Sequence, residues 1–151
     1  MNSEASYLRD KILIELNRNK LQLDTVYAEN IAFKSTIDSL LALDKIEGNF
    51  SISIASELLT QSAWDFTKSS RSFSYLDEDF LNDAAELYER QAYYMHISNQ
   101  MFQNLGDMLI SDPKPRKTVS ISNYYLLNLN ASAVELMSTY NSFLQKHKPT
   151  D

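Results

Sequence analysis

The chain has 151 residues, a length typical of one domain, and carries a formal net charge of −6. The negative charge argues against a nucleic-acid partner, because binding to phosphates needs clustered Lys and Arg. Cysteine is absent, which excludes disulfides, thiolate catalysis and metal sites with Cys ligands. Because the chain has only 2 Gly and 3 Pro, long helices are favoured over a turn-rich β fold.

The first expected helix covers approximately residues 4–44, a stretch without Gly or Pro. Its apolar residues recur every three or four positions, which predicts one buried stripe: Leu8, Ile12, Leu16, Leu23, Val26, Phe33, Ile37 and Leu40. Asn19 and Asn30 complete this stripe, so we expect both on a buried seam. They could set the register of the helices, be solvated, or line a polar pocket.

The second expected helix covers approximately residues 53–68. Gly48-Asn49 ends the first helix, and Ser51 or Ser53 can cap the second. The serine-rich link Ser69–Ser74 is expected to be irregular.

The third expected helix covers approximately residues 77–110 and opens with Asp77-Glu78-Asp79. Acidic residues at a helix start accept hydrogen bonds from free N–H groups and complement the helix dipole. Two adjacent apolar stripes follow, which predicts a wide packing face against more than one neighbour. Gln91 and Ser98 lie within this face and add two polar positions to the buried seam.

The last expected helix covers approximately residues 120–146. Pro113 and Pro115 interrupt the helical pattern, Ser120 or Ser122 can cap the new helix, and its end is expected to fray near His147. These four helices predict a single all-α domain over residues 1–151, an antiparallel four-helix bundle with long first and third helices.

No metal site or cofactor is expected from the motifs. His96 has Tyr93 three positions before it, where a bundle metal site needs Glu, and His147 is expected at a frayed end. The acidic run from Asp77 lacks the Gly and Glu of a calcium loop, since Asn82 and Tyr88 stand in those places. The acids are therefore interpreted as helix caps.

Catalytic signatures are also absent from the sequence. There is no Gly-x-Ser-x-Gly motif and too little Gly for a nucleotide-binding loop. Paired carboxylates such as Glu86 and Glu89 are typical of a solvated helix face. An enzyme that uses carboxylates and His96 in an interhelical cleft remains an alternative.

Aromatic residues supply the candidate ligand site. Trp64, Tyr88, Tyr94 and Tyr124 combine apolar rings with polar groups and could line a small-molecule cleft between helices. The competing interpretation is that they belong to the core and its edge.

One group of residues resembles a known family. Tyr7-Leu8, Ile12, Glu15-Leu16, Asn19 and Leu23, followed by Ala63-Trp64 and by Leu76 with Leu87-Tyr88, are similar to uncharacterised bacterial proteins. That family has a short N-terminal membrane helix followed by a helical domain outside the membrane. The resemblance covers about residues 5 to 105. It implies that the chain is the soluble part of a single-pass protein whose anchor was removed, and it implies no activity.

The function expected from the sequence is non-catalytic: an interaction or ligand-sensing domain with an unknown protein or small-molecule partner. If the resemblance holds, the full-length protein is tethered to a bacterial membrane and the domain is extracytoplasmic. Otherwise the domain is cytoplasmic. A structural bundle that oligomerises is the third alternative, in which Asn19, Asn30, Gln91 and Ser98 set helix register or a homodimer contact.

Overall fold

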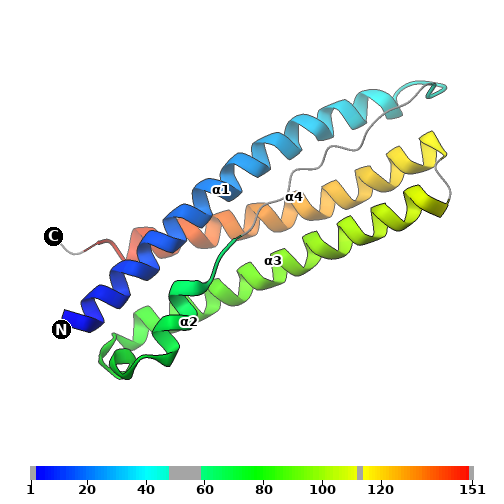
Figure 1. The fold of residues 1–151 in the computed structure, drawn as a ribbon. Helices are drawn as coiled ribbons and strands as arrows, with labels where there is room; N and C mark the ends of the chain where they lie inside the picture. Colours follow the sequence, from blue (N-terminus) through cyan, green and yellow to red (C-terminus); the bar gives the residue numbers. More distant parts are fainter. Residues whose placement is uncertain (1–2, 48–58, 112–113, 150–151) are drawn as a thin grey trace.

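The computed structural model describes residues 3–47, 59–111 and 114–149 and is helical (Figure 1). Its elements are α1 (Ser3–Leu41), α2 (Ser62–Ser69), the 3-10 helix η1 (Arg71–Tyr75), α3 (Glu78–Ser111) and α4 (Pro115–Lys146). No β-strand occurs in these three ranges. The predicted all-α fold is confirmed.

Helix α4 packs along both α1 and α3, while α2 and η1 pack against α1 at one end of the molecule (Figure 1). Arg9 near the start of α1 donates a hydrogen bond to the carbonyl of Lys148, just beyond the end of α4, at 3.0 Å. At the opposite end, Arg116 near the start of α4 donates to the carbonyl of Leu43, beyond the end of α1, at 3.2 Å. These two bonds tie the chain at the ends of α1 and α4 together.

The core is formed by the predicted apolar stripes. One continuous cluster joins α1, α2, α3 and α4, and its fully enclosed side chains include Ile12, Leu16, Leu23, Ile37, Phe80, Leu87, Leu126, Leu129 and Tyr140. At about 25 cal/mol per Å² of buried apolar surface, this stripe packing provides the main stabilisation of helices of such length.

The second predicted helix differs most from the structure. Helix α2 begins at Ser62, and Leu59, Thr60 and Gln61 before it are not helical. The remainder of that prediction, including the caps at Ser51 and Ser53, lies outside the described residues. The link expected to be irregular contains η1, and Ser70 caps its start by accepting a hydrogen bond from the Ser72 backbone N–H at 3.1 Å.

The start of α3 confirms the capping prediction, since the Asp77 carboxylate accepts from the Phe80 backbone N–H at 3.1 Å. The predicted start of the last helix at residue 120 is wrong. Helix α4 begins at Pro115, because proline at the first helical position loses an N–H that would have no partner within the helix. The predicted caps are wrong as well: Ser122 lies inside α4 and donates to the Thr118 carbonyl.

Across the described ranges, no helix combines the length and apolar character that crossing a membrane requires.

Candidate functional site

A carboxylate is enclosed where α1, α2 and α3 meet. Glu15 of α1 is 5% exposed. One of its oxygens accepts from the Tyr88 hydroxyl at 2.6 Å. The other accepts from the Ser62 hydroxyl at 2.9 Å, and from the Thr60 hydroxyl and the Ala63 backbone N–H at 3.1 Å each. Both oxygens are thus held by protein donors.

Glu15 caps a helix to which it does not belong. Ala63 lies in the first turn of α2, where backbone N–H groups have no partner within the helix, and the side chain of Gln61 at the cap position accepts no bond from these groups. A carboxylate at this position also complements the positive end of the helix dipole. Burial, together with the bond to Glu15, raises the pKa of Tyr88 far above its ordinary value, so its hydroxyl remains a donor.

Side-chain amides extend this network across the bundle. Asn19 of α1 and Gln91 of α3 both donate to the Thr60 carbonyl, at 2.8 and 3.0 Å. The Asn19 oxygen accepts from the Thr60 N–H at 3.1 Å. The Gln91 oxygen accepts from Asn19 at 2.9 Å and from the hydroxyl of Tyr140 on α4. Three long helices are therefore bonded to one another and to the chain that enters α2.

The predicted polar seam is buried as expected, since Asn19, Asn30, Gln91 and Ser98 are all 3% exposed or less. For Asn19 and Gln91 the structure favours the register-setting role, because sliding one helix by a turn would break several bonds at once. We refer to Glu15, Asn19, Thr60, Tyr88, Gln91 and Tyr140 as the polar lock.

Sequence reasoning missed Glu15, Thr60 and Tyr140 as parts of this network. For Glu15 a signal existed: it lies three positions after Ile12 and four before Asn19, which places it on the apolar stripe. A glutamate at a position of the apolar stripe predicts a carboxylate that is buried and bonded to protein donors.

Of the four candidate ligand residues, the structure stacks two on each other. Trp64 stacks on Tyr88, with ring centroids 5.4 Å apart and an angle of 9° between the planes. Tyr94 is buried in the core at 1% exposure. Tyr124 is exposed on α4 and packs against Tyr125. A ligand between Trp64 and Tyr88 would have to separate a formed ring stack.

A surface hollow lies between α1 and α2, and Glu15 of the polar lock forms part of its lining. Its volume is about 370 Å³. We call it the α1–α2 hollow; it is lined by Tyr7, Lys11, Ile14, Glu15, Arg18, Ser62, Ala63 and Phe66. Tyr7, Ile14 and Phe66 are more than half exposed there. Solvated apolar side chains gathered in a concave site are typical of a binding surface.

Two cations line the same hollow. Lys11 lies over the Tyr7 ring, with its Nζ 5.3 Å from the centroid. Among the residues that the structure describes, neither Lys11 nor Arg18 has a carboxylate partner. Glu15 is the acidic residue in the lining of the hollow, and both of its carboxylate oxygens already accept bonds from neutral donors.

The end of α4 is ordered, which corrects the expectation that it frays at His147. This residue is 7% exposed, and its Nε2 lies 2.6 Å from an Asp83 oxygen. Its ring packs between Phe80 and Phe143, with centroid distances of 5.2 and 4.8 Å. A C-cap histidine is held here by ring packing and a carboxylate that the sequence alone does not bring together.

Asp79, Asp83 and His147 are the described residues with the ligand types and spacing for a metal ion, their ligand atoms lying within 4.8 Å of one another. The Lys146 ammonium contacts both carboxylates, at 2.9 and 2.8 Å, and so takes the place that a cation would take. The bonds from Lys146 and His147 lower the pKa of Asp83, and the two carboxylates raise that of Lys146 to about 12.

The enzymatic alternative places His96 and carboxylates in an interhelical cleft. His96 is exposed on α3, and Glu86 pairs with Arg90 of the same helix at 2.9 Å. Glu86 and Arg90 do line a second hollow of about 270 Å³ between α3 and α4, together with Asp83 and Lys146. Its charged groups are paired with one another, which is typical of a solvated helix face.

Comparison of the chain with protein-family models, with curated proteins and with solved structures found no match.

Proposed function

We propose that this chain is a non-catalytic binding domain and that the α1–α2 hollow is its binding surface. The single observation that carries the proposal is the combination of exposed Tyr7, Ile14 and Phe66 with Lys11 and Arg18 in one concave site. Apolar contact area with a few charged groups at its edge is the usual composition of a binding site.

The use of the buried polar groups supports binding over catalysis. A general acid or base needs a position within hydrogen-bond reach of a substrate proton. Glu15 and Tyr88 are the enclosed acid and hydroxyl nearest the hollow, and they are bonded to each other. Glu15 uses its remaining acceptor capacity to cap α2. Their role is to hold the wall of the hollow in place.

We further infer an antiparallel bundle in which α4 runs opposite to α1 and α3, with the short α2 as the fourth helix. The bonds from Arg9 to Lys148 and from Lys146 to Asp83 support this arrangement, since they join the start of α1 and the start of α3 to the end of α4.

Site-specific photo-crosslinking in the native host tests the binding surface. A photoreactive phenylalanine analogue replaces Phe66 in one variant and Tyr124 in a control. The control is matched, since the two positions are 61% and 64% exposed. We expect a discrete crosslinked species from position 66 and none from position 124. Equal patterns, or no species from position 66, would contradict the proposal.

The bacterial membrane tether is part of the proposal and rests on the resemblance alone. Its test is the reading frame of the gene: a segment of about 20 apolar residues immediately upstream supports a tethered, extracytoplasmic domain. A frame without such a segment removes the tether and favours a cytoplasmic location, and it leaves the binding surface unaffected.

A further inference from the structure

We propose that the α1–α2 hollow receives an acidic amphipathic helix from a partner protein. This inference rests on the proposed binding function and adds the chemistry of the partner. It follows from the spacing of the exposed apolar residues, the placement of the cations and the shape of the site between two helices.

Three exposed apolar residues in the first half of α1 repeat every seven positions. Tyr7, Ile14 and Leu21 are 54%, 53% and 65% exposed, so none of them is used by the bundle core. Seven residues span about 10.5 Å along a helix, which is two turns. A partner helix lying along α1 would meet this row with its own heptad-spaced apolar residues.

The cations follow the same repeat. Lys11 and Arg18 are seven residues apart, and each follows an apolar residue of the row by four positions, which places it beside that residue on the helix surface. Glu or Asp at heptad-spaced flanking positions of a partner could pair with both at once. This arrangement corresponds to the charged flanks that select partners in coiled coils.

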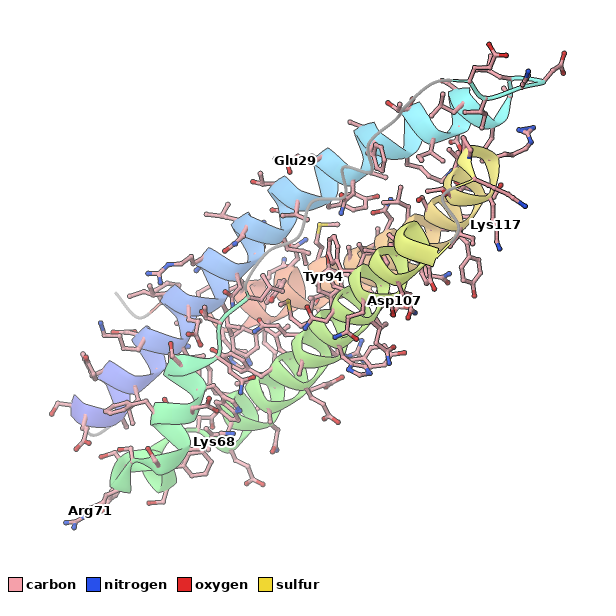
Figure 2. The ribbon with its side chains drawn as sticks, turned by 45° about the vertical axis from the view of Figure 1, so that its right-hand side comes forward. Glu29, Lys68, Arg71, Tyr94, Asp107 and Lys117 are labelled. Carbon is pink, nitrogen blue, oxygen red and sulfur yellow. The ribbon has the colours of Figure 1, made fainter. Side chains whose placement is uncertain are left out.

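Helix α2 closes the other side of the site. Phe66 of α2 is 61% exposed and lines the hollow together with Ile14 of α1. An incoming helix would therefore contact α1 along its length and Phe66 at one end. The view in Figure 2 shows α2, with Lys68 labelled, beside the first half of α1.

A second copy of the chain fits this surface less well. In a symmetric antiparallel pairing of two α1 helices, equivalent flanking positions meet. Lys11 and Arg18 would then face the same cations of the other copy, which is unfavourable. Against that antiparallel pairing, charge complementarity favours a different, acidic chain.

Two designed peptides of three heptads test the proposal. Both carry leucine along one seam and are stapled into helices; one has Glu at the flanking positions, and the other has Lys there. We expect fluorescence anisotropy to show that the Glu peptide binds at least ~10-fold more tightly than the Lys peptide, as two exposed ion pairs would give.

Matched variants locate the binding on the protein. Lys11→Glu/Arg18→Glu should weaken the Glu peptide ~10-fold or more and strengthen the Lys peptide. Lys45→Glu/Lys117→Glu makes the same change in net charge at the other end of the molecule and should alter neither affinity by more than about 2-fold. Phe66→Ala should weaken binding ~10-fold, whereas Tyr124→Ala should not. Circular dichroism establishes that each variant is folded.

Other outcomes would overturn the inference. These are equal affinity for both peptides, effects of the 45/117 variant equal to those of the 11/18 variant, or a lack of binding by either peptide. Binding to anionic lipid vesicles that Lys11→Glu/Arg18→Glu abolishes, without peptide binding, would assign the cations to a membrane surface. Concentration-dependent dimerisation in analytical ultracentrifugation that Ile14→Ser abolishes would assign the row to a second copy. A crosslink from position 66 to a non-helical partner would retain the binding function and reject only the acidic helix.

Discussion

Replacing Glu15 separates the contribution of its charge from that of its hydrogen bonds. In Glu15→Gln, the amide oxygen can still accept from Ser62, Thr60 and the Ala63 N–H. The bond to Tyr88 is reversed, because the amide NH₂ can only donate to the Tyr88 oxygen and the Tyr88 O–H loses its acceptor. The three bonds that hold the start of α2 are kept, while the charge and the acceptor for Tyr88 are lost. Since hydrogen bonds to charged groups contribute more than neutral ones, we expect a loss of about 1–2 kcal/mol in the free energy of unfolding.

Glu15→Ala should cost more, because it leaves groups without partners. The hydroxyls of Thr60 and Ser62 are near the surface and can bond to water. The Tyr88 hydroxyl is in a residue only 3% exposed, and the Ala63 N–H loses its cap. Two unsatisfied donors at about 1–3 kcal/mol each, together with lost packing, predict a loss of roughly 3–5 kcal/mol.

Urea unfolding followed by tryptophan fluorescence measures both losses. Trp64 is the only tryptophan and stacks on Tyr88, so its emission reports on this part of the structure. Glu29→Ala on the exposed face of α1, labelled in Figure 2, is the matched control and should stay within about 0.5 kcal/mol. A Glu15→Ala loss below about 1 kcal/mol, or a Gln variant as destabilised as the Ala variant, would refute the reasoning.

Four further changes test the remaining parts of the structure. Asn19→Ala should lower the free energy of unfolding by about 2–4 kcal/mol in the same urea assay, because it leaves Thr60 and Gln91 without their partner; a loss equal to that of the exposed Asn17→Ala would contradict this. Since the pKa of Tyr88 is raised in the folded state, its contribution is complete below pH 10 and declines above it, so the stability advantage of the wild type over Tyr88→Phe should shrink between pH 10 and 11.5. Since the pKa of Asp83 is lowered in the folded state, its contribution is complete above its ordinary value of 3.8 and declines as the pH falls below that value, so the stability advantage of the wild type over Asp83→Asn at pH 7 should shrink in acid. His147→Ala should cost about 1–3 kcal/mol through lost ring packing, and no loss in thermal unfolding would indicate that the end of α4 is frayed.

The long helices could be predicted from the sequence because each buries one stripe over many turns. The steps from Leu8 to Leu40, and the polar positions Asn19 and Gln91 within the stripes, indicated which faces are enclosed. Such a repeat depends only on helical geometry and on hydrophobic burial, both of which are local properties.

The ends of elements and the site itself depend on contacts between distant parts of the chain. From the sequence, Pro115 is interpreted as a helix breaker, whereas in the structure α4 begins at this residue. From the sequence, His147 is expected at a frayed helix end, whereas in the structure it contacts Asp83 and Phe80, which lie far away in the chain. The α1–α2 hollow forms where Glu15 of α1 accepts a hydrogen bond from the Ala63 N–H at the start of α2. These two residues are 48 positions apart in the chain. No local pattern contains that pairing.

The central claim, that the α1–α2 hollow is the binding surface, is tested most directly by mapping amide chemical shifts in the ¹⁵N-labelled protein as the Glu peptide is added. We expect the shifted amides to belong to the first half of α1, between Tyr7 and Leu21, and to α2, Ser62–Ser69. Shifts confined to the α3–α4 face around Arg90 and Ser138, with α1 and α2 unchanged, would contradict it.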